Sequence, residues 1–336
     1  MITPDDVEFH TPDDPHDPTW AETNYFGFYN AELHTNIGLY TIFRPNLGVV
    51  MSTISINSGQ ARQPWLADFF DHQAHLAIPE DGRLSDFTLA NGLSITCHEP
   101  NMKWHLGYDD GQGTVVDVEY TSLMQPFDIH DPDQDPIVAA QQAAASGTFA
   151  WGTAYNGHFD QTGHFVGHVD VRGKRIPIDC VSTMDHSWGP RKERGAPNMS
   201  WFHAHFGTDY ALHSIWSFDH TGGTDELTLA HGYVLKDGEV RGLAAGTGRT
   251  VRDADHYARQ VEVEVSDANG RSYAFTGEGL TRFPWQFVPN TVGFNVLARW
   301  QSDGRTGHGE IQDFVDVTTL TELTEAERSR ATAGSA

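Results

Sequence analysis

Apolar and polar residues alternate over short stretches that end in Gly, Asp or Asn, and this pattern constrains the fold more than any other feature of the chain. In residues 114–123, Val116, Val118 and Tyr120 would point to one side of a strand and the residues between them to the other. Residues 38–43 form a similar run. The 3.6-residue period of an amphipathic helix is nearly absent. We therefore expect an antiparallel all-β structure, either a sandwich or a barrel.

Turn sequences join these runs mainly to their neighbours in the chain. Gly-containing hairpin turns are expected at 109–113, 172–174, 236–238 and 267–270. Residues 128–145 depart from the pattern, because an Asp- and Pro-rich stretch leads into an Ala- and Gln-rich run that favours a short helix. We expect a surface excursion there, and whether it forms a lid over a cavity is left open.

The length of the chain favours two domains. It has 336 residues, whereas a usual domain has roughly 100 to 200. We place an N-terminal domain at 21–191 and a C-terminal domain at 192–320, with a Gly- and Pro-containing link at 192–198. The Asp- and Pro-rich residues 1–20 are expected to form a disordered arm, and residues 321–336 a flexible tail.

Charge and cysteine content exclude several kinds of protein. Asp and Glu number 46 against 21 Lys and Arg, giving a formal net charge of −25, and such a field repels nucleic acid and anionic lipid. Cys97 and Cys180 are too few for a disulfide scaffold or a four-cysteine zinc site. No apolar run approaches the ~18 to 20 residues that span a bilayer, so we expect a cytoplasmic protein without an integral membrane segment. The sequence does not predict its oligomeric state.

The segment from Asp185 to Arg191 reads Asp-His-Ser-Trp-Gly-Pro-Arg. It places a carboxylic acid, an imidazole, an indole and a guanidinium within seven residues, which makes it the strongest candidate for a catalytic segment. Its Gly-Pro pair should end a strand. An apolar pocket could keep Asp185 protonated, so that it donates a proton to an alkene or enol. Trp188 would stabilise the resulting cation, and His186 would activate a water molecule. Arg191 would anchor the substrate.

A structural interpretation of the same segment remains open. Asp185 and Arg191 could form an ion pair, His186 could cap the turn, and Trp188 could belong to the core. Strict alternation would also place His186 and Trp188 on one face of the strand and Asp185 on the other. A β-bulge would be needed to bring them together.

Over residues 157–191, and at this signature above all, the chain resembles the superfamily of carotenoid 1,2-hydratase (hydroxyneurosporene synthase) and the AttH-like proteins, including a bacterial branch with the same seven residues. The resemblance takes in 158–161 and, more weakly, 307–312, and covers most of 25–318. It implies two lipocalin-like β domains. It also implies cofactor-independent chemistry on hydrophobic substrates, either water addition to isolated double bonds or pericyclic cyclisation.

The resemblance assigns roles to some residues and leaves one role unfilled. A His-x-Trp pair helps to form the hydratase site, and it matches His186 and Trp188. A Tyr-x-Asp pair on a later strand supplies the acid in the hydratases. Residues 211–215 read Ala-Leu-His-Ser-Ile instead. The acid would then be Asp185 or His213.

Three further histidines suggest a metal-dependent alternative. Trp201, His203 and His205 share one face of a predicted strand, and His213 can lie on the adjoining strand. Three imidazoles can bind zinc, iron or copper. The preferred interpretation nevertheless assigns no metal and no cofactor.

We therefore expect a cofactor-independent hydratase, lyase or cyclase that acts by acid/base chemistry on a terpenoid, steroid-like or polyketide molecule. A lipocalin-like protein that binds such a ligand without turnover is the first alternative, and a metal enzyme using His203, His205 and His213 is the second. The predicted catalytic residues are Asp185, His186, Trp188, Arg191, His203 and His205. The predicted substrate-binding residues are His158, Gln161, Trp201, His213 and Trp216, and Trp151 is a further aromatic expected in the core or cavity wall.

Overall fold

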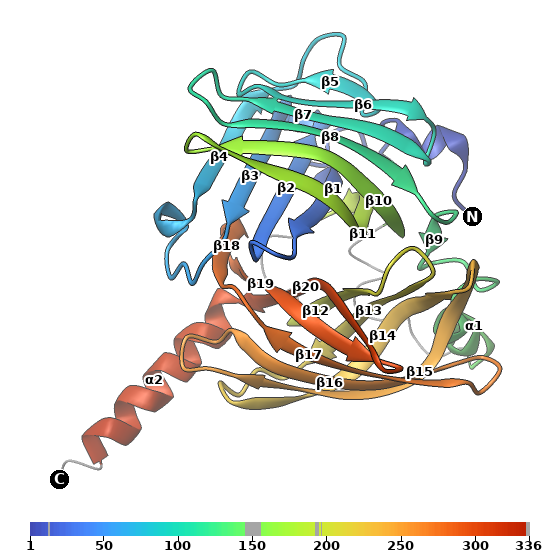
Figure 1. Ribbon diagram of the computed structural model, residues 1–336, viewed down its shortest axis with the longest axis vertical. Coiled ribbons are helices and arrows are strands. Elements are labelled where there is room, and N and C mark those ends of the chain that lie inside the picture. Colours follow the sequence, from blue (N-terminus) through green and yellow to red (C-terminus); the bar gives the residue numbers. More distant parts are fainter. Residues whose placement is uncertain (13, 145–155, 192–194, 196, 334–336) are drawn as a thin grey trace.

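The computed structural model describes residues 1–12, 14–144, 156–191, 195 and 197–333 (Figure 1). Antiparallel strands dominate both halves of the chain, which confirms the predicted fold class of two packed, lipocalin-like β domains. Trp151 and most of the expected link at 192–198 lie outside the described residues.

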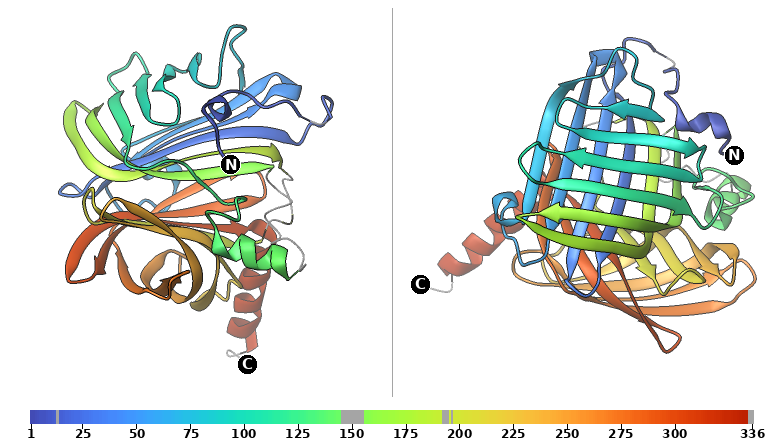
Figure 2. Two further views of the ribbon diagram at one scale, coloured as in Figure 1. Left: turned by 90° about the vertical axis from the view of Figure 1, so that its right-hand side faces the viewer. Right: turned by 45° about the horizontal axis from the view of Figure 1, so that its top comes forward.

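The N-terminal half is one curled, open sheet (Figure 2). Its strands are β1 (Trp20–Asn30), β2 (Thr35–Arg44), β3 (Val49–Asn57), β4 (Phe69–Ala77), β5 (Asp86–Thr88), β6 (Leu93–Glu99), β7 (Lys103–Asp109), β8 (Val115–Ser122), β9 (Phe127–Asp128), β10 (Gly157–Val171) and β11 (Lys174–Pro190). They follow the order β4-β3-β2-β1-β11-β10-β8-β7-β6-β5, and β9 pairs with β10. The sheet forms a half-barrel, with β1 and β11 side by side at its centre.

The C-terminal half is a closed barrel. Its strands are β12 (Met199–His205), β13 (Tyr210–Phe218), β14 (Thr224–Lys236), β15 (Glu239–Arg252), β16 (Ala258–Asp267), β17 (Ser272–Gly279), β18 (Phe283–Val288), β19 (Thr291–Ser302) and β20 (Arg305–Asp316). They follow the order β17-β16-β15-β14-β13-β12-β20-β19-β18. The pairing of β17 with β19 closes the barrel and leaves β18 as a flap at its edge.

Alternation along the strands gives each half its own core and leaves a second face for the contact between the halves. On β1, Phe26 and Phe28 are fully buried inside the half-barrel. Tyr25, which lies between Asn24 and Phe26, points out of the half-barrel into a cluster shared with Met199 and Phe314 of the C-terminal half. The outer face of the β1–β11–β10 region thus packs on β12, β13 and β20 (Figure 1).

Residues 1–20, expected as a disordered arm, contact the half-barrel instead. The 3-10 helix η1 (Pro4–Val7) is capped by Thr3, and Val7 is buried in the N-terminal core. His10 hydrogen-bonds to Glu22 on β1. Composition suggested disorder, whereas these few tertiary contacts hold the segment against the sheet. Two further 3-10 turns are η2 (Pro45–Leu47) and η3 (Pro64–Leu66).

The two α-helices lie at the edges of the molecule. In the excursion at 128–145, α1 (Pro136–Ala143) is capped by Asp135 and packs beside β15 of the barrel. The segment expected as a flexible tail is largely helical, because α2 (Val317–Ala333) continues directly from β20 and projects away from the barrel (Figure 1). Within the described residues, no helix is both long and apolar enough to cross a membrane.

Candidate active site

A pocket lies between the two halves, and its walls carry both polar and aromatic side chains. The residues that line it are Tyr25, Tyr40, His158, Asp185, Ser187, Arg191, Met199, Trp201, Trp285, Gln312 and Phe314. They come from β1, β2, β10 and β11 of the half-barrel and from β12, β18 and β20 of the barrel. Four of the predicted site residues therefore meet here, namely Asp185, Arg191, His158 and Trp201.

Alternation along β11 divides the Asp185–Arg191 segment between two faces of the sheet. Through this segment β11 pairs with β1 and β10 without a register shift, so the bulge that would unite it is absent. Asp185 and Ser187 face the pocket between the halves. His186 and Trp188 face the interior of the half-barrel, where Trp188 packs on the N-terminal core. The expectation that Asp185 and His186 act on one substrate is thus corrected, because neighbouring residues of a regular strand point in opposite directions.

Asp185 is a carboxyl group held away from bulk water. Burial raises its pKa to about 7. In this net value His158 and Arg191 act against burial, and the nearby carboxylate of Asp160, its partner across β10 and β11, acts with it. A carboxyl group with such a pKa can hold a proton at neutral pH and also release it, as a general acid must.

Arg191 extends across the edge of the pocket from the end of β11. Its guanidinium donates hydrogen bonds to Ser187 Oγ, to the Tyr40 hydroxyl at 3.2 Å and to Thr23 Oγ1 at 3.3 Å. Its backbone N–H donates to Thr19 O at 2.7 Å. These bonds fix the position of a cation at the pocket, where it can bind a polar substituent of a ligand.

A chain of buried polar groups centred on Asp160 runs from the pocket wall into the C-terminal half. Asp160 Oδ2 lies 3.0 Å from His158 Nε2 and 3.0 Å from His213 Nε2. His213 Nδ1 lies 3.0 Å from His203 Nδ1. Burial opposes ionisation of Asp160, but His213 and His158 outweigh it and hold the pKa of this carboxyl well below its usual range. Burial lowers the pKa of His158, and Asp160 more than reverses this shift.

A second buried carboxyl, Glu310, lies in the same interface on β20. It accepts hydrogen bonds from the Tyr25 hydroxyl at 2.7 Å, from Asn36 Nδ2 at 2.6 Å and from Gln312 Nε2 at 2.9 Å. Burial raises its pKa although these bonds favour the charged form. Glu310 thus fixes Tyr25 and Gln312, two of the polar groups that line the pocket.

Three other predicted residues lie away from the pocket. Trp216 is fully buried inside the C-terminal barrel, where its indole donates to Ser214 Oγ. Gln161 is buried and donates to Ser122 Oγ and Met124 O, both at 3.0 Å. His205 lies on β12 with its ring parallel to that of His203, and the ring centroids are 6.4 Å apart. Trp216 and Gln161 therefore have structural environments rather than pocket-facing ones.

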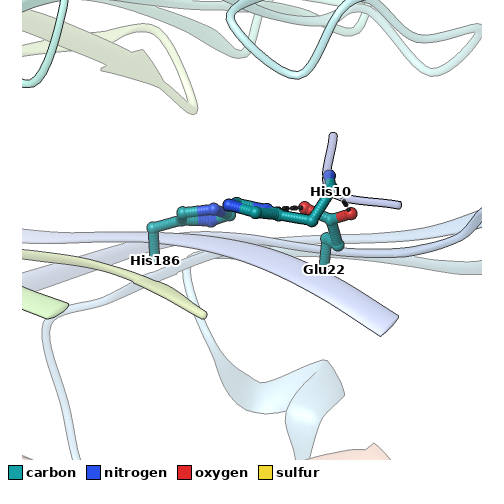
Figure 3. Close-up of side chains that lie close together, drawn as sticks. All are labelled: His10, Glu22 and His186. Atoms are coloured by element: carbon teal, nitrogen blue, oxygen red, sulfur yellow. Dashed lines mark hydrogen bonds and ion pairs between the residues drawn. The ribbon is translucent and has the colours of Figure 1, made fainter. Parts of the chain in front are cut away.

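The three histidines of the metal alternative do not form a compact ligand set. His203 and His213 share a hydrogen bond between their Nδ1 atoms, and His205 extends the row along β12. Among the described residues, the one group of three or more His, Cys, Asp or Glu side chains whose ligand atoms all lie within 4.8 Å of each other is His10, Glu22 and His186 (Figure 3). The geometry therefore does not favour a metal at His203, His205 and His213.

Some groups at the site were missed by the sequence analysis. Asp160 could have been predicted from the sequence, because it follows His158 by two residues on the same strand and therefore lies on the same face. Glu310 and Gln312 are spaced in the same way on β20. Tyr25 could not be found from its neighbours, since only the contact between the two halves brings it to Glu310.

The pocket is narrow, and an apolar groove adjoins it. Its volume is about 40 Å³, which is room for a few waters. The groove has a volume of about 870 Å³ and includes Ile42, Met51 and Val288 in its walls. Arg191 lines both spaces. A ligand with a long apolar part could therefore occupy the groove and reach the pocket with one end.

Comparisons with known proteins match this chain to one family model and to solved structures with a similar fold. The model of a family described as domain of unknown function (DUF7064) matches residues 3–315. A crystal structure assigned as AttH from Nitrosomonas europaea has a TM-score of 0.61, with 12% identity over 94% of this chain and 96% of the other. Kievitone hydratase from Nectria haematococca has a TM-score of 0.51, with 12% identity over 88% of each chain.

A third solved structure is that of CghA with Sch210972. It has a TM-score of 0.51 and 13% identity, over 89% of each chain. No curated protein sequence matches the chain. At these identities the similarity shows a shared fold, and this fold is the one that the sequence resemblance implied.

Proposed function

The chain belongs to the DUF7064 domain family, and we propose that it catalyses acid/base chemistry with its own side chains on an unsaturated, largely apolar small molecule, as a hydratase, lyase or cyclase. The observation that carries the proposal is the interdomain pocket, where the carboxyl of Asp185 lies among aromatic rings beside His158. The name of kievitone hydratase, a protein of the same fold, agrees with this class of chemistry.

In the proposed hydration, Asp185 transfers its proton to one alkene carbon, and the π electrons form the new C–H bond. The neighbouring carbon becomes a cation, which the rings of Trp201 and Trp285 stabilise. A water molecule attacks this cation and forms the C–O bond while His158 accepts its released proton. That proton then returns to the Asp185 carboxylate, which restores the starting state.

His158 is suited to the role of base by its contact with Asp160. If its Nε2–H donates to Asp160, the neutral ring carries its lone pair on Nδ1. A buried carboxylate behind a histidine fixes the ring and stabilises the imidazolium that forms. His213, on the other side of Asp160, holds this carboxylate in place. In a lyase the same steps run in reverse, and in a cyclase an internal nucleophile replaces water.

The apolar groove supports a substrate with a hydrophobic body, such as a terpenoid, a steroid-like molecule or a polyketide. Its reactive end would enter the pocket past Arg191, which lines both spaces. A non-catalytic binding protein would use the same groove and pocket. The two functions differ in whether a bound compound is converted.

The test uses the full-length chain, a panel of terpenoid, steroid and polyketide alkenes and alcohols, and detection of products by mass spectrometry. A compound that gains or loses water, or cyclises, should be converted roughly 10² to 10⁴ times more slowly by Asp185→Asn. The exposed Asp179→Asn on the same strand is the matched control and should keep wild-type turnover. Conversion by Asp185→Asn at the wild-type rate would contradict the proposal, and binding without conversion would favour the carrier.

A further inference from the structure

A second cluster of polar side chains lies inside the half-barrel, on the face of β11 opposite the pocket. His10 precedes β1, Glu22 lies on β1 and His186 lies on β11. Glu22 and His186 are almost completely buried. Figure 3 shows the His10 and His186 rings next to each other beside the Glu22 carboxylate, and their planes are 24° apart. The proposed reaction uses none of these three residues.

Hydrogen bonds hold each of the three side chains in place. His186 Nδ1 lies 2.6 Å from Thr23 O, so Nδ1 carries the proton and Nε2 carries the lone pair. His10 Nε2 lies 3.0 Å from Asp6 Oδ1. Glu22 Oε1 accepts from the His10 backbone N–H at 2.7 Å. His10 Nδ1 and Glu22 Oε2 pair with each other at 3.0 Å, and His186 Nε2 has no partner.

We propose that His10 Nδ1, Glu22 Oε2 and His186 Nε2 bind one divalent transition-metal ion, with Zn²⁺ as the type case. Two imidazoles and a carboxylate are ligands that zinc, iron(II) and cobalt(II) accept. Ligand atoms at about 2.1 Å from such an ion lie about 3.0 to 3.4 Å from one another. His10 Nδ1 and Glu22 Oε2 are already 3.0 Å apart, and one ligand atom from each of the three residues lies within 4.8 Å of the other two. A ring movement on the order of 1 Å would close the set.

Unsatisfied polar atoms on the same face provide an independent indication of a bound group. His186 Nε2 is buried and has no hydrogen-bond partner. Asn24 lies directly opposite His186 across β1 and β11, and Thr41 lies directly opposite Asn24 across β1 and β2. Asn24 Nδ2 and Thr41 Oγ1 are also buried without a partner. Such atoms usually indicate a water or an ion, and three protein ligands leave a coordination position for a water molecule.

The hydrogen-bond acceptors next to His10 and His186 match those that commonly surround metal-bound histidines. Metal-bound histidines commonly donate their other ring N–H to a carboxylate or a backbone carbonyl. Asp6 provides the first for His10, and Thr23 O provides the second for His186. The ion would tie the segment before β1 to two central strands of the half-barrel, and so would stabilise the fold. It does not depend on the proposed reaction, because Asp185 faces the other side of β11.

The test is a titration of the EDTA-treated, full-length protein with Zn²⁺ by calorimetry and with Co²⁺ by visible absorption. We expect one ion per chain with a Kd below about 1 µM and a rise in Tm on binding. His186→Gln should weaken binding at least about 100-fold. His164→Gln is the matched control, because this histidine is partly exposed on β10 and pairs with Asp179; it should leave the affinity unchanged.

Two further variants keep the test decisive. If His186→Gln fails to fold, His10→Gln replaces it, because His10 is partly exposed outside the sheet. A Kd weaker than about 100 µM for both ions would show that His10, Glu22 and Asp6 form an ion pair only, and would overturn the proposal. Tight binding that survives His10→Gln but is lost in His213→Gln would also overturn it, since the metal would then belong to the other histidines.

Discussion

Replacing Asp185 with Asn should stabilise the fold at alkaline pH while it removes the proposed proton donor. In the folded protein burial raises the pKa of Asp185 from 3.8 to about 7. The folded chain therefore keeps this proton up to about pH 7, whereas the unfolded chain releases it near pH 4. Stability falls as the pH rises through this window, by about 4 kcal/mol in total, since each pKa unit corresponds to about 1.4 kcal/mol.

The assay is urea denaturation of the wild type and Asp185→Asn in EDTA-containing buffer at pH 5 and pH 8. The variant has no group that titrates at this position. Its free energy of unfolding, relative to the wild type, should therefore rise by about 3 kcal/mol between the two pH values. Asp81→Asn, in an exposed turn, is the control and should show a constant difference.

A difference that stays constant between pH 5 and pH 8 for Asp185→Asn would refute this reasoning. It would mean that Asp185 is ionised in the folded protein across the whole range, as in a structural ion pair with Arg191. The carboxyl could then not supply a proton at neutral pH.

Three further changes test buried contacts of the fold. Asp160→Asn removes the carboxylate between two buried histidines and should cost about 3 to 5 kcal/mol of unfolding free energy at pH 7; the wild type should lose this contribution below about pH 4. Arg252→Met removes the guanidinium that pairs with the buried Asp225 and Asp313 and should lower stability by about 3 kcal/mol, visible by calorimetry as a lower Tm. Gly309→Ala places a Cβ against the backbone of β12 and should cost about 1 to 3 kcal/mol, seen as a lower urea midpoint. An unchanged value for any variant would contradict the contact behind it.

The fold could be predicted because the alternation of apolar and polar residues along a strand shows which of its faces is buried. The run around Val116, Val118 and Tyr120 shows it, since these side chains all point into the N-terminal core. The arm at 1–20 was predicted wrongly, because its attachment depends on a few contacts such as Val7 with the core and His10 with Glu22. Composition carries no information about such long-range contacts.

The candidate site could be predicted only in part. The pocket is lined by four residues that the sequence had indicated from their side-chain chemistry, namely Asp185, Arg191, His158 and Trp201. Their grouping with His186 was wrong. Because β11 has no bulge here, consecutive residues lie on opposite faces of the sheet, and His186 points away from the pocket. The partners supplied by β20 and β13 depend on how the two halves pack, which no local pattern specifies.

The most direct test of the central claim is turnover in D₂O of any compound that the wild-type protein converts, with products analysed by NMR. If Asp185 protonates a substrate carbon, the hydrated or cyclised product must carry one deuterium on that carbon, and Asp185→Asn must form it roughly 10² to 10⁴ times more slowly. A product without carbon-bound deuterium, formed at the same rate by both proteins, would show that the pocket acts by other chemistry.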